Sequence, residues 1–124
     1  MDFTPLETYL RRVPSITGPI GQGTEDGMWW IKFAIDIEHE LAWRVVQELG
    51  HVLNYLSLDE RLPTVFKPVS PPPYLNGGPH TFLSWVIECD RFDFPPLACA
   101  EWLEGRLPRP VDDFAAWKNE DLDS

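Results

Sequence analysis

The chain contains only two cysteines, Cys89 and Cys99, in 124 residues. Two cysteines are too few for the disulfide framework of a small secreted domain, and we expect two buried thiols, although a single disulfide between them stays open. No apolar run reaches the length of a membrane span, and the residues after Met1 lack the apolar stretch of a signal peptide. These absences favour a protein of the bacterial cytoplasm over a secreted or membrane protein.

Basic residues are also scarce. Ten Lys and Arg stand against 20 Asp and Glu, which gives a formal net charge of -10 and a pI near 4.5. A domain that binds nucleic acid or an anionic membrane normally has the opposite balance, because contacts to phosphate need Lys and Arg. The acidity has two open interpretations: it keeps the protein soluble, or it attracts a basic partner and speeds association.

Catalytic and cofactor motifs are missing as well. The sequence has no Gly-x-Ser-x-Gly elbow, no phosphate-binding glycine loop and no Cys-x-x-Cys pair. His39 and His51 lie about 18 Å apart on a predicted helix, so they cannot share a metal ion directly. The sequence therefore predicts no catalytic residue, no cofactor and no metal site, and we expect that the protein is not an enzyme.

What the sequence does contain is a clear strand pattern. Within 28–37, apolar residues occupy all five odd positions, Trp29, Ile31, Phe33, Ile35 and Ile37. We expect the first four to face the core together with Leu49, Leu53, Leu83, Trp85 and Ile87. A second strand is predicted at 81–89. A short one within 62–69 is flanked by prolines, which either confine it to a sheet edge or give it ragged ends. Residues 14–27 are rich in glycine and proline, and we interpret them as a loop with at most a short edge strand.

Helical spacing of apolar residues predicts a long helix at 38–58, between an opening helix at 4–12 and a later one at 95–104. The resulting order, α-β-α-β-β-α, predicts an α+β fold: a small, mostly antiparallel sheet of three to four strands with helices packed on one face. We expect one domain over 1–110 and an acidic C-terminal segment over 111–124.

The segment 70–79, Ser-Pro-Pro-Pro-Tyr-Leu-Asn-Gly-Gly-Pro, allows two structural interpretations. It is either a stiff connection between two paired strands or a preformed contact loop that carries Tyr74. A stiff loop loses little entropy on binding, and tyrosine is a good interface anchor. Both interpretations stay open on the sequence alone.

Three stretches together resemble small bacterial immunity proteins, in particular those of contact-dependent growth inhibition toxin systems. They are Trp29-Trp30-Ile31-Lys32-Phe33-Ala34-Ile35-Asp36, Leu41-Ala42-Trp43-Arg44-Val45-Val46-Gln47-Glu48-Leu49-Gly50, and the proline-rich segment 70–79. The resemblance covers roughly 28–110 and includes no signature motif. It implies a cytoplasmic protein that binds and neutralises one cognate toxin domain, often a nuclease.

A net charge of -10 fits a basic toxin partner. We predict a partner-binding surface of acids that steer the partner and aromatics that anchor it, made of Asp36, Glu38, Glu40, Tyr74, Asp112, Asp113 and Trp117. Neither nucleic acid nor a membrane is an expected direct partner. Two alternatives remain: another acidic adaptor or mobile-element accessory protein, and a small enzyme.

Overall fold

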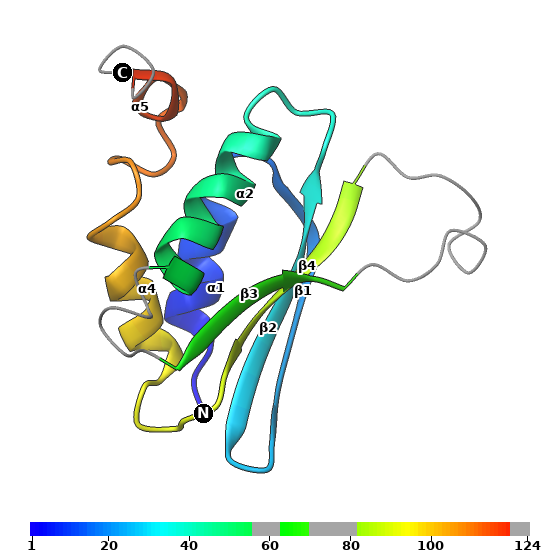
Figure 1. Ribbon diagram of the computed structural model, residues 1–124, viewed down its shortest axis with the longest axis vertical. Coiled ribbons are helices and arrows are strands. Elements are labelled where there is room, and N and C mark those ends of the chain that lie inside the picture. Colours follow the sequence, from blue (N-terminus) through cyan, green and yellow to red (C-terminus); the bar gives the residue numbers. More distant parts are fainter. Residues whose placement is uncertain (56–62, 70–81, 120–124) are drawn as a thin grey trace, which may run out of the picture.

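A computed structural model of the chain describes residues 1–55, 63–69 and 82–119 (Figure 1). In chain order its elements are α1 (Thr4–Arg11), β1 (Ile16–Glu25), β2 (Met28–Asp36), α2 (Ala42–Gly50), the π-helical turn η1 (His51–Tyr55), β3 (Thr64–Pro68), β4 (Phe82–Cys89), α4 (Pro96–Glu104) and α5 (Phe114–Asn119). The predicted α+β class is confirmed.

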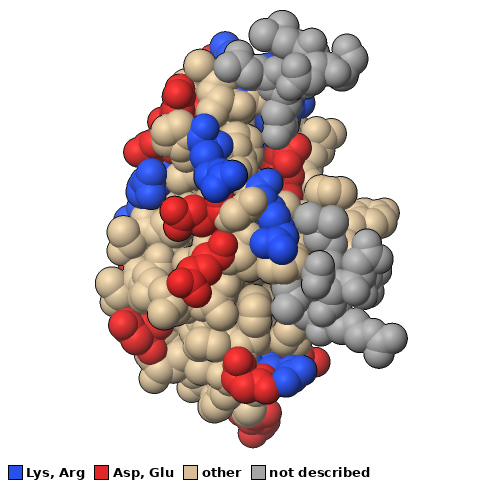
Figure 2. All heavy atoms as spheres, turned by 90° about the vertical axis from the view of Figure 1, so that its left-hand side faces the viewer, with Lys and Arg blue, Asp and Glu red and all other residues tan. Residues whose placement is uncertain are grey.

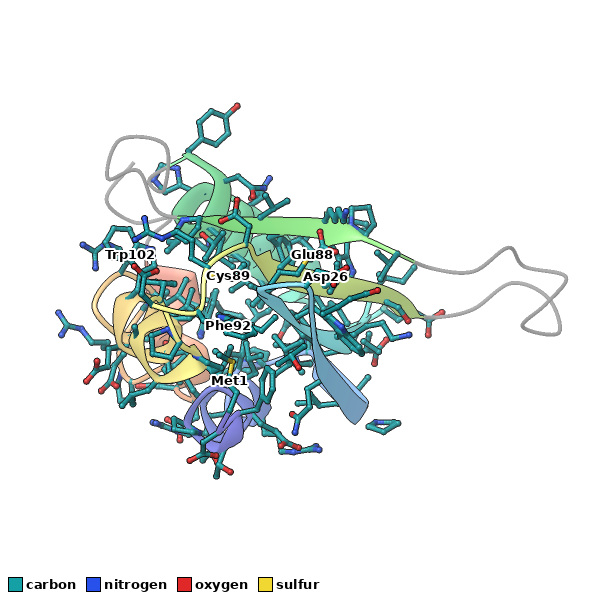
Figure 3. All side chains as sticks on the ribbon, turned by 90° about the horizontal axis from the view of Figure 1, so that it is seen from below. Met1, Asp26, Glu88, Cys89, Phe92 and Trp102 are labelled. Atoms are coloured by element: carbon teal, nitrogen blue, oxygen red, sulfur yellow. The ribbon has the colours of Figure 1, made fainter. Side chains whose placement is uncertain are left out.

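One four-stranded sheet runs in the order β1-β2-β4-β3, and every neighbouring pair is antiparallel. The helices α1, α2 and α4 cover one face of this sheet, as Figures 1 and 3 show from two directions. β3 lies at an edge, which is one of the two outcomes expected from its flanking prolines. The sheet and the helical layer on one face therefore agree with the prediction from the sequence.

The core lies between the sheet and the helices. All four alternating residues of β2 are buried, as predicted, and so are Leu49, Leu53, Trp85 and Ile87; the side chain of Leu83 lies outside the described residues. Phe66 of β3 stacks between Phe33 and Trp85, with ring centroids 6.2 Å and 4.9 Å away. Alternation in β2 thus identified the buried face correctly.

The interpretation of 14–27 as a loop was wrong, because β1 is a ten-residue strand paired with β2. Its low strand propensity is overridden by tertiary pairing. The register shifts between Thr17 and Gly21, a bulge that contains Pro19, which has no N–H to donate. Trp30, on the face of β2 away from the core, lies across the glycines: a Cβ built on Gly23 would come within 2.7 Å of its indole.

The second helix also begins later than predicted. A turn at 37–41 precedes α2, and the carboxylate of Asp36 accepts the Glu38 N–H at 3.0 Å inside this turn. The ring nitrogen Nδ1 of His39 accepts the Leu41 N–H at 3.0 Å. These side-chain hydrogen bonds compete with helical ones, which explains why the turn replaces the first helical residues.

The chain after α4 packs back onto the domain. Val111 and Trp117 belong to the same buried core as the sheet and the helices. The indole N–H of Trp117 donates to the carbonyl of Val111 at 2.8 Å. Residues 111–119 are therefore part of the core structure. Among the described helices, we find none with the length and apolar composition needed to cross a bilayer.

Candidate partner-binding surface

Two acid-bearing segments that are far apart in the sequence meet at one end of the molecule. The first is the turn between β2 and α2, with Glu38 and Glu40 exposed. The second is the segment 112–119, which carries Asp112 and Asp113 directly before α5, the helix at the top of Figure 1. The Lys118 ammonium lies 3.2 Å from the Glu40 carboxylate, and the rings of His39 and Phe114 are 5.5 Å apart between centroids. The fold therefore joins the two predicted clusters of acids into one surface.

We call this surface the acidic end and define it by Asp36, Glu38, Glu40, Asp112 and Asp113. Asp112 pairs with Arg12, the residue directly after α1, at 3.4 Å. Asp113 accepts the N–H of Ala115 at 2.9 Å, which satisfies a donor in the first turn of α5. Each of these two acids thus has a structural contact as well as an exposed side chain.

The ion pairs at the acidic end are weak. In the Glu40–Lys118 pair the side chains are 60% and 50% exposed, and the Arg12–Asp112 pair is similarly open to solvent. Exposed pairs of this kind contribute about 0–1 kcal/mol each. A basic partner can therefore displace Lys118 or Arg12 at little cost. Figure 2 shows Lys and Arg interspersed with Asp and Glu across the helical side rather than gathered in separate fields.

The aromatic residues of this end differ from the prediction. Trp117 was expected to anchor a partner, but its side chain is fully buried, so it presents no surface in this fold. Phe114 and Trp43, at 38% and 53% exposure, are the aromatic side chains available here. The helical pattern could have identified Trp43, because it falls opposite the buried positions of α2. Tyr74 lies outside the described residues.

The thiols show no sign of a site. Cys89 and Cys99 are both buried and free, so the disulfide left open by the sequence is not formed. Burial raises the pKa of each thiol, which keeps both protonated and poorly nucleophilic. Cys89 Sγ also lies 3.2 Å from the carbonyl of Arg91. Within 1–55, 63–69 and 82–119, no three His, Cys, Asp or Glu side chains form a group that could hold a metal ion.

The opposite end of the sheet carries the β1–β2 hairpin. The register places Trp29 beside Cys89 and Thr24, so this end lies a full strand length from Asp36. Figure 3 looks onto it and labels Asp26 of the hairpin and Glu88 of β4. Glu25 and Asp90 are exposed here. They provide a matched pair of acids, remote from the acidic end, for the experiments below.

Comparison with known proteins gives no relative that bears on this surface. No family model matches the chain, and no curated protein and no solved structure is significantly similar to it.

Proposed function

We propose that this protein is an immunity protein that binds and neutralises a cognate basic toxin domain, a nuclease in the favoured case, and that the acidic end makes the contact. The observation that carries the proposal is the contact of the β2–α2 turn with the segment 112–119, through Glu40 and Lys118 and through His39 and Phe114, which brings acids of two distant segments to one end of the molecule. The resemblance of the sequence to immunity proteins supports the class of partner.

Long-range attraction and short-range packing have separate roles in this proposal. The carboxylates raise the association rate by steering a basic partner, and salt screens this effect. Phe114 and Trp43 supply exposed aromatic area next to them, which slows dissociation once it is buried. Because a nuclease surface is basic where it meets phosphate, an acidic binder competes with its substrate.

The direct test is co-expression with the protein encoded next to this gene. We expect a stable complex that survives purification and protects a host cell from the activity of that neighbour. An adaptor would bind a partner without abolishing any toxicity, so a complex that leaves the neighbour fully active contradicts neutralisation.

A paired variant locates the contact. The double variant Glu38→Lys with Asp112→Lys should bind the partner more weakly and protect the host cell less. The double variant Glu25→Lys with Asp90→Lys, at the opposite end of the sheet, should change neither property. Both pairs make the same change in net charge, and all four positions are exposed. Equal loss of binding in the two variants would show that total charge matters and that the acidic end does not.

A further inference from the structure

A groove on the helical side, apart from the toxin contact proposed above, has the features of a small-molecule site. α1 and α4 pack against each other, and two adjoining hollows of about 360 Å³ and 280 Å³ lie along them. Both hollows are lined by Tyr9, Arg12 and Glu104. Volumes of this size are typical of sites that hold small ligands.

Tyr9 is one of the residues that line both hollows, and its hydroxyl is buried. The residue is only 5% exposed, and its hydroxyl oxygen has no hydrogen-bond partner within the described residues. Buried polar groups in folded proteins nearly always have a partner, so this one requires an explanation. Burial and the nearby Glu104 carboxylate raise the pKa of Tyr9 to about 12, so the phenol keeps its proton near neutral pH and can donate it.

Two guanidinium groups lie close enough to act electrostatically on that hydroxyl, those of Arg12 and Arg109. Arg109 lines the larger hollow, is exposed, and makes no ion pair with any other described residue. Arg12 is only weakly engaged by Asp112, as described above. A guanidinium offers five N–H donors, so this end of the groove holds unused donors for an anion.

The smaller hollow combines apolar and polar lining residues. Beside the three shared residues it is lined by the apolar Pro5, Leu97 and Ala100 and by Thr8 and Glu101. Leu97 of α4 is 51% exposed, so its side chain is accessible to an apolar group of a ligand. Glu104 belongs to both hollows and repels a second negative charge. The groove is therefore suited to a ligand with one anionic group and an apolar tail.

We propose that the groove binds a small amphiphilic monoanion, whose carboxylate or phosphate lies between Arg12 and Arg109 and accepts a hydrogen bond from the Tyr9 hydroxyl, while its tail lies along Leu97 and Ala100. The proposal does not depend on toxin binding. Carboxylate and phosphate share the chemistry that the two arginines recognise, and the probes below separate them.

The test is a titration of the isotope-labelled protein, followed by two-dimensional NMR, with hexanoate, hexyl methyl phosphate (a phosphate diester with a single negative charge) and 1-hexanol. We expect saturable shifts of α1 and α4 amides with at least one anion, and none with the alcohol at the same concentration. The anion that binds more tightly identifies the head group. No saturable shift with either anion, or equal binding of the alcohol, overturns the proposal.

Three variants check the contacts. Arg109→Gln should weaken binding about tenfold or more, and Tyr9→Phe several-fold, because hydrogen bonds to a charged group are lost. Arg106→Gln is the matched control, since Arg106 stacks on Trp102 with its guanidinium carbon 3.2 Å from the ring centroid and does not line the groove. Undiminished binding by Arg109→Gln, or an equal loss in Arg106→Gln, contradicts the assignment.

Discussion

The side-chain amide of Asn54 pairs with the backbone of Phe66 as a neighbouring strand would. The Phe66 N–H donates to Asn54 Oδ1 at 2.8 Å, and Asn54 Nδ2 donates to the Phe66 carbonyl at 3.0 Å. One residue earlier, the Leu53 carbonyl accepts the hydroxyl of Thr64 at 3.0 Å. These contacts satisfy backbone groups at the edge of β3. Unpaired N–H and C=O groups at a sheet edge can otherwise pair with a strand of another chain.

Removing the amide should expose that edge. We expect Asn54→Ala to lower the free energy of unfolding by about 1–3 kcal/mol, because the Phe66 N–H loses its acceptor in a half-buried place. The variant should also self-associate more readily. Chemical unfolding and analytical ultracentrifugation measure the two effects. Gln47→Ala, exposed on α2, is the control and should be near neutral in both; a monomeric Asn54→Ala with unchanged stability would contradict this role.

Two glycines of β1 form a matched pair beneath Trp30. A Cβ on Gly23 would come within 2.7 Å of the indole, whereas one on Gly21 would lie 3.8 Å from it, an ordinary contact. Gly23→Ala should therefore destabilise the protein by about 1–3 kcal/mol, because the indole must move. Gly21→Ala should cost about 0.5 kcal/mol or less. Urea unfolding of the two variants measures both losses of stability. Equal losses would show that Trp30 does not lie over Gly23.

Trp117 is buried and Phe114 is exposed, so we expect Trp117 to stabilise the fold and Phe114 to contact a partner. Trp117→Ala should cost about 3–5 kcal/mol, since a fully buried ring and its hydrogen bond to Val111 are lost. Phe114→Ala should cost about 1 kcal/mol or less and act mainly on partner dissociation. Thermal unfolding and binding kinetics measure the two effects. Normal stability with lost binding in Trp117→Ala would restore the original expectation of a surface anchor there.

The stability of the fold should decrease in alkali. Burial raises the pKa of Cys99 above its ordinary value of 9.0 and that of Tyr9 from 10.0 to about 12. Above these ordinary values the unfolded chain loses protons that the folded chain keeps, so the free energy of unfolding falls as pH rises. Urea unfolding across pH 8 to 12, in about one-unit steps, measures the slope. Tyr9→Phe should reduce the loss between pH 10 and 12; a flat profile contradicts the burial of both groups.

The sequence predicted the elements with strong periodicity and missed those fixed by tertiary contacts. Alternation in β2 identified the buried face because one strand face must meet the helices. β1 could not be predicted in the same way, because its glycines and proline disfavour a strand. It is held by pairing with β2, by the cover of Trp30 and by packing of Ile16 and Ile20 against the core. η1 was likewise expected to be ordinary helix, because the pairing of Asn54 with Phe66 involves β3, a separate strand twelve residues further along the chain.

The candidate surface was predictable in part for the same reason. The acids of the β2–α2 turn and of 112–113 were recognisable as charged clusters, but their contact through Glu40 and Lys118 requires the fold. Trp117 was mistaken for an anchor because composition alone does not distinguish a buried indole from an exposed one near the end of a chain. The Tyr9 groove gave no sequence signal, because its residues come from α1, α4 and the segment after α4.

The most direct test of the central claim is the association rate of the protein with the purified protein encoded next to its gene, the proposed partner, measured by stopped-flow at increasing salt. We predict a rate that falls steeply with salt, and at low salt a rate reduced by Glu38→Lys with Asp112→Lys but not by Glu25→Lys with Asp90→Lys. A rate that is independent of salt, or equally reduced by both pairs, would contradict the claim that the acidic end receives a basic partner.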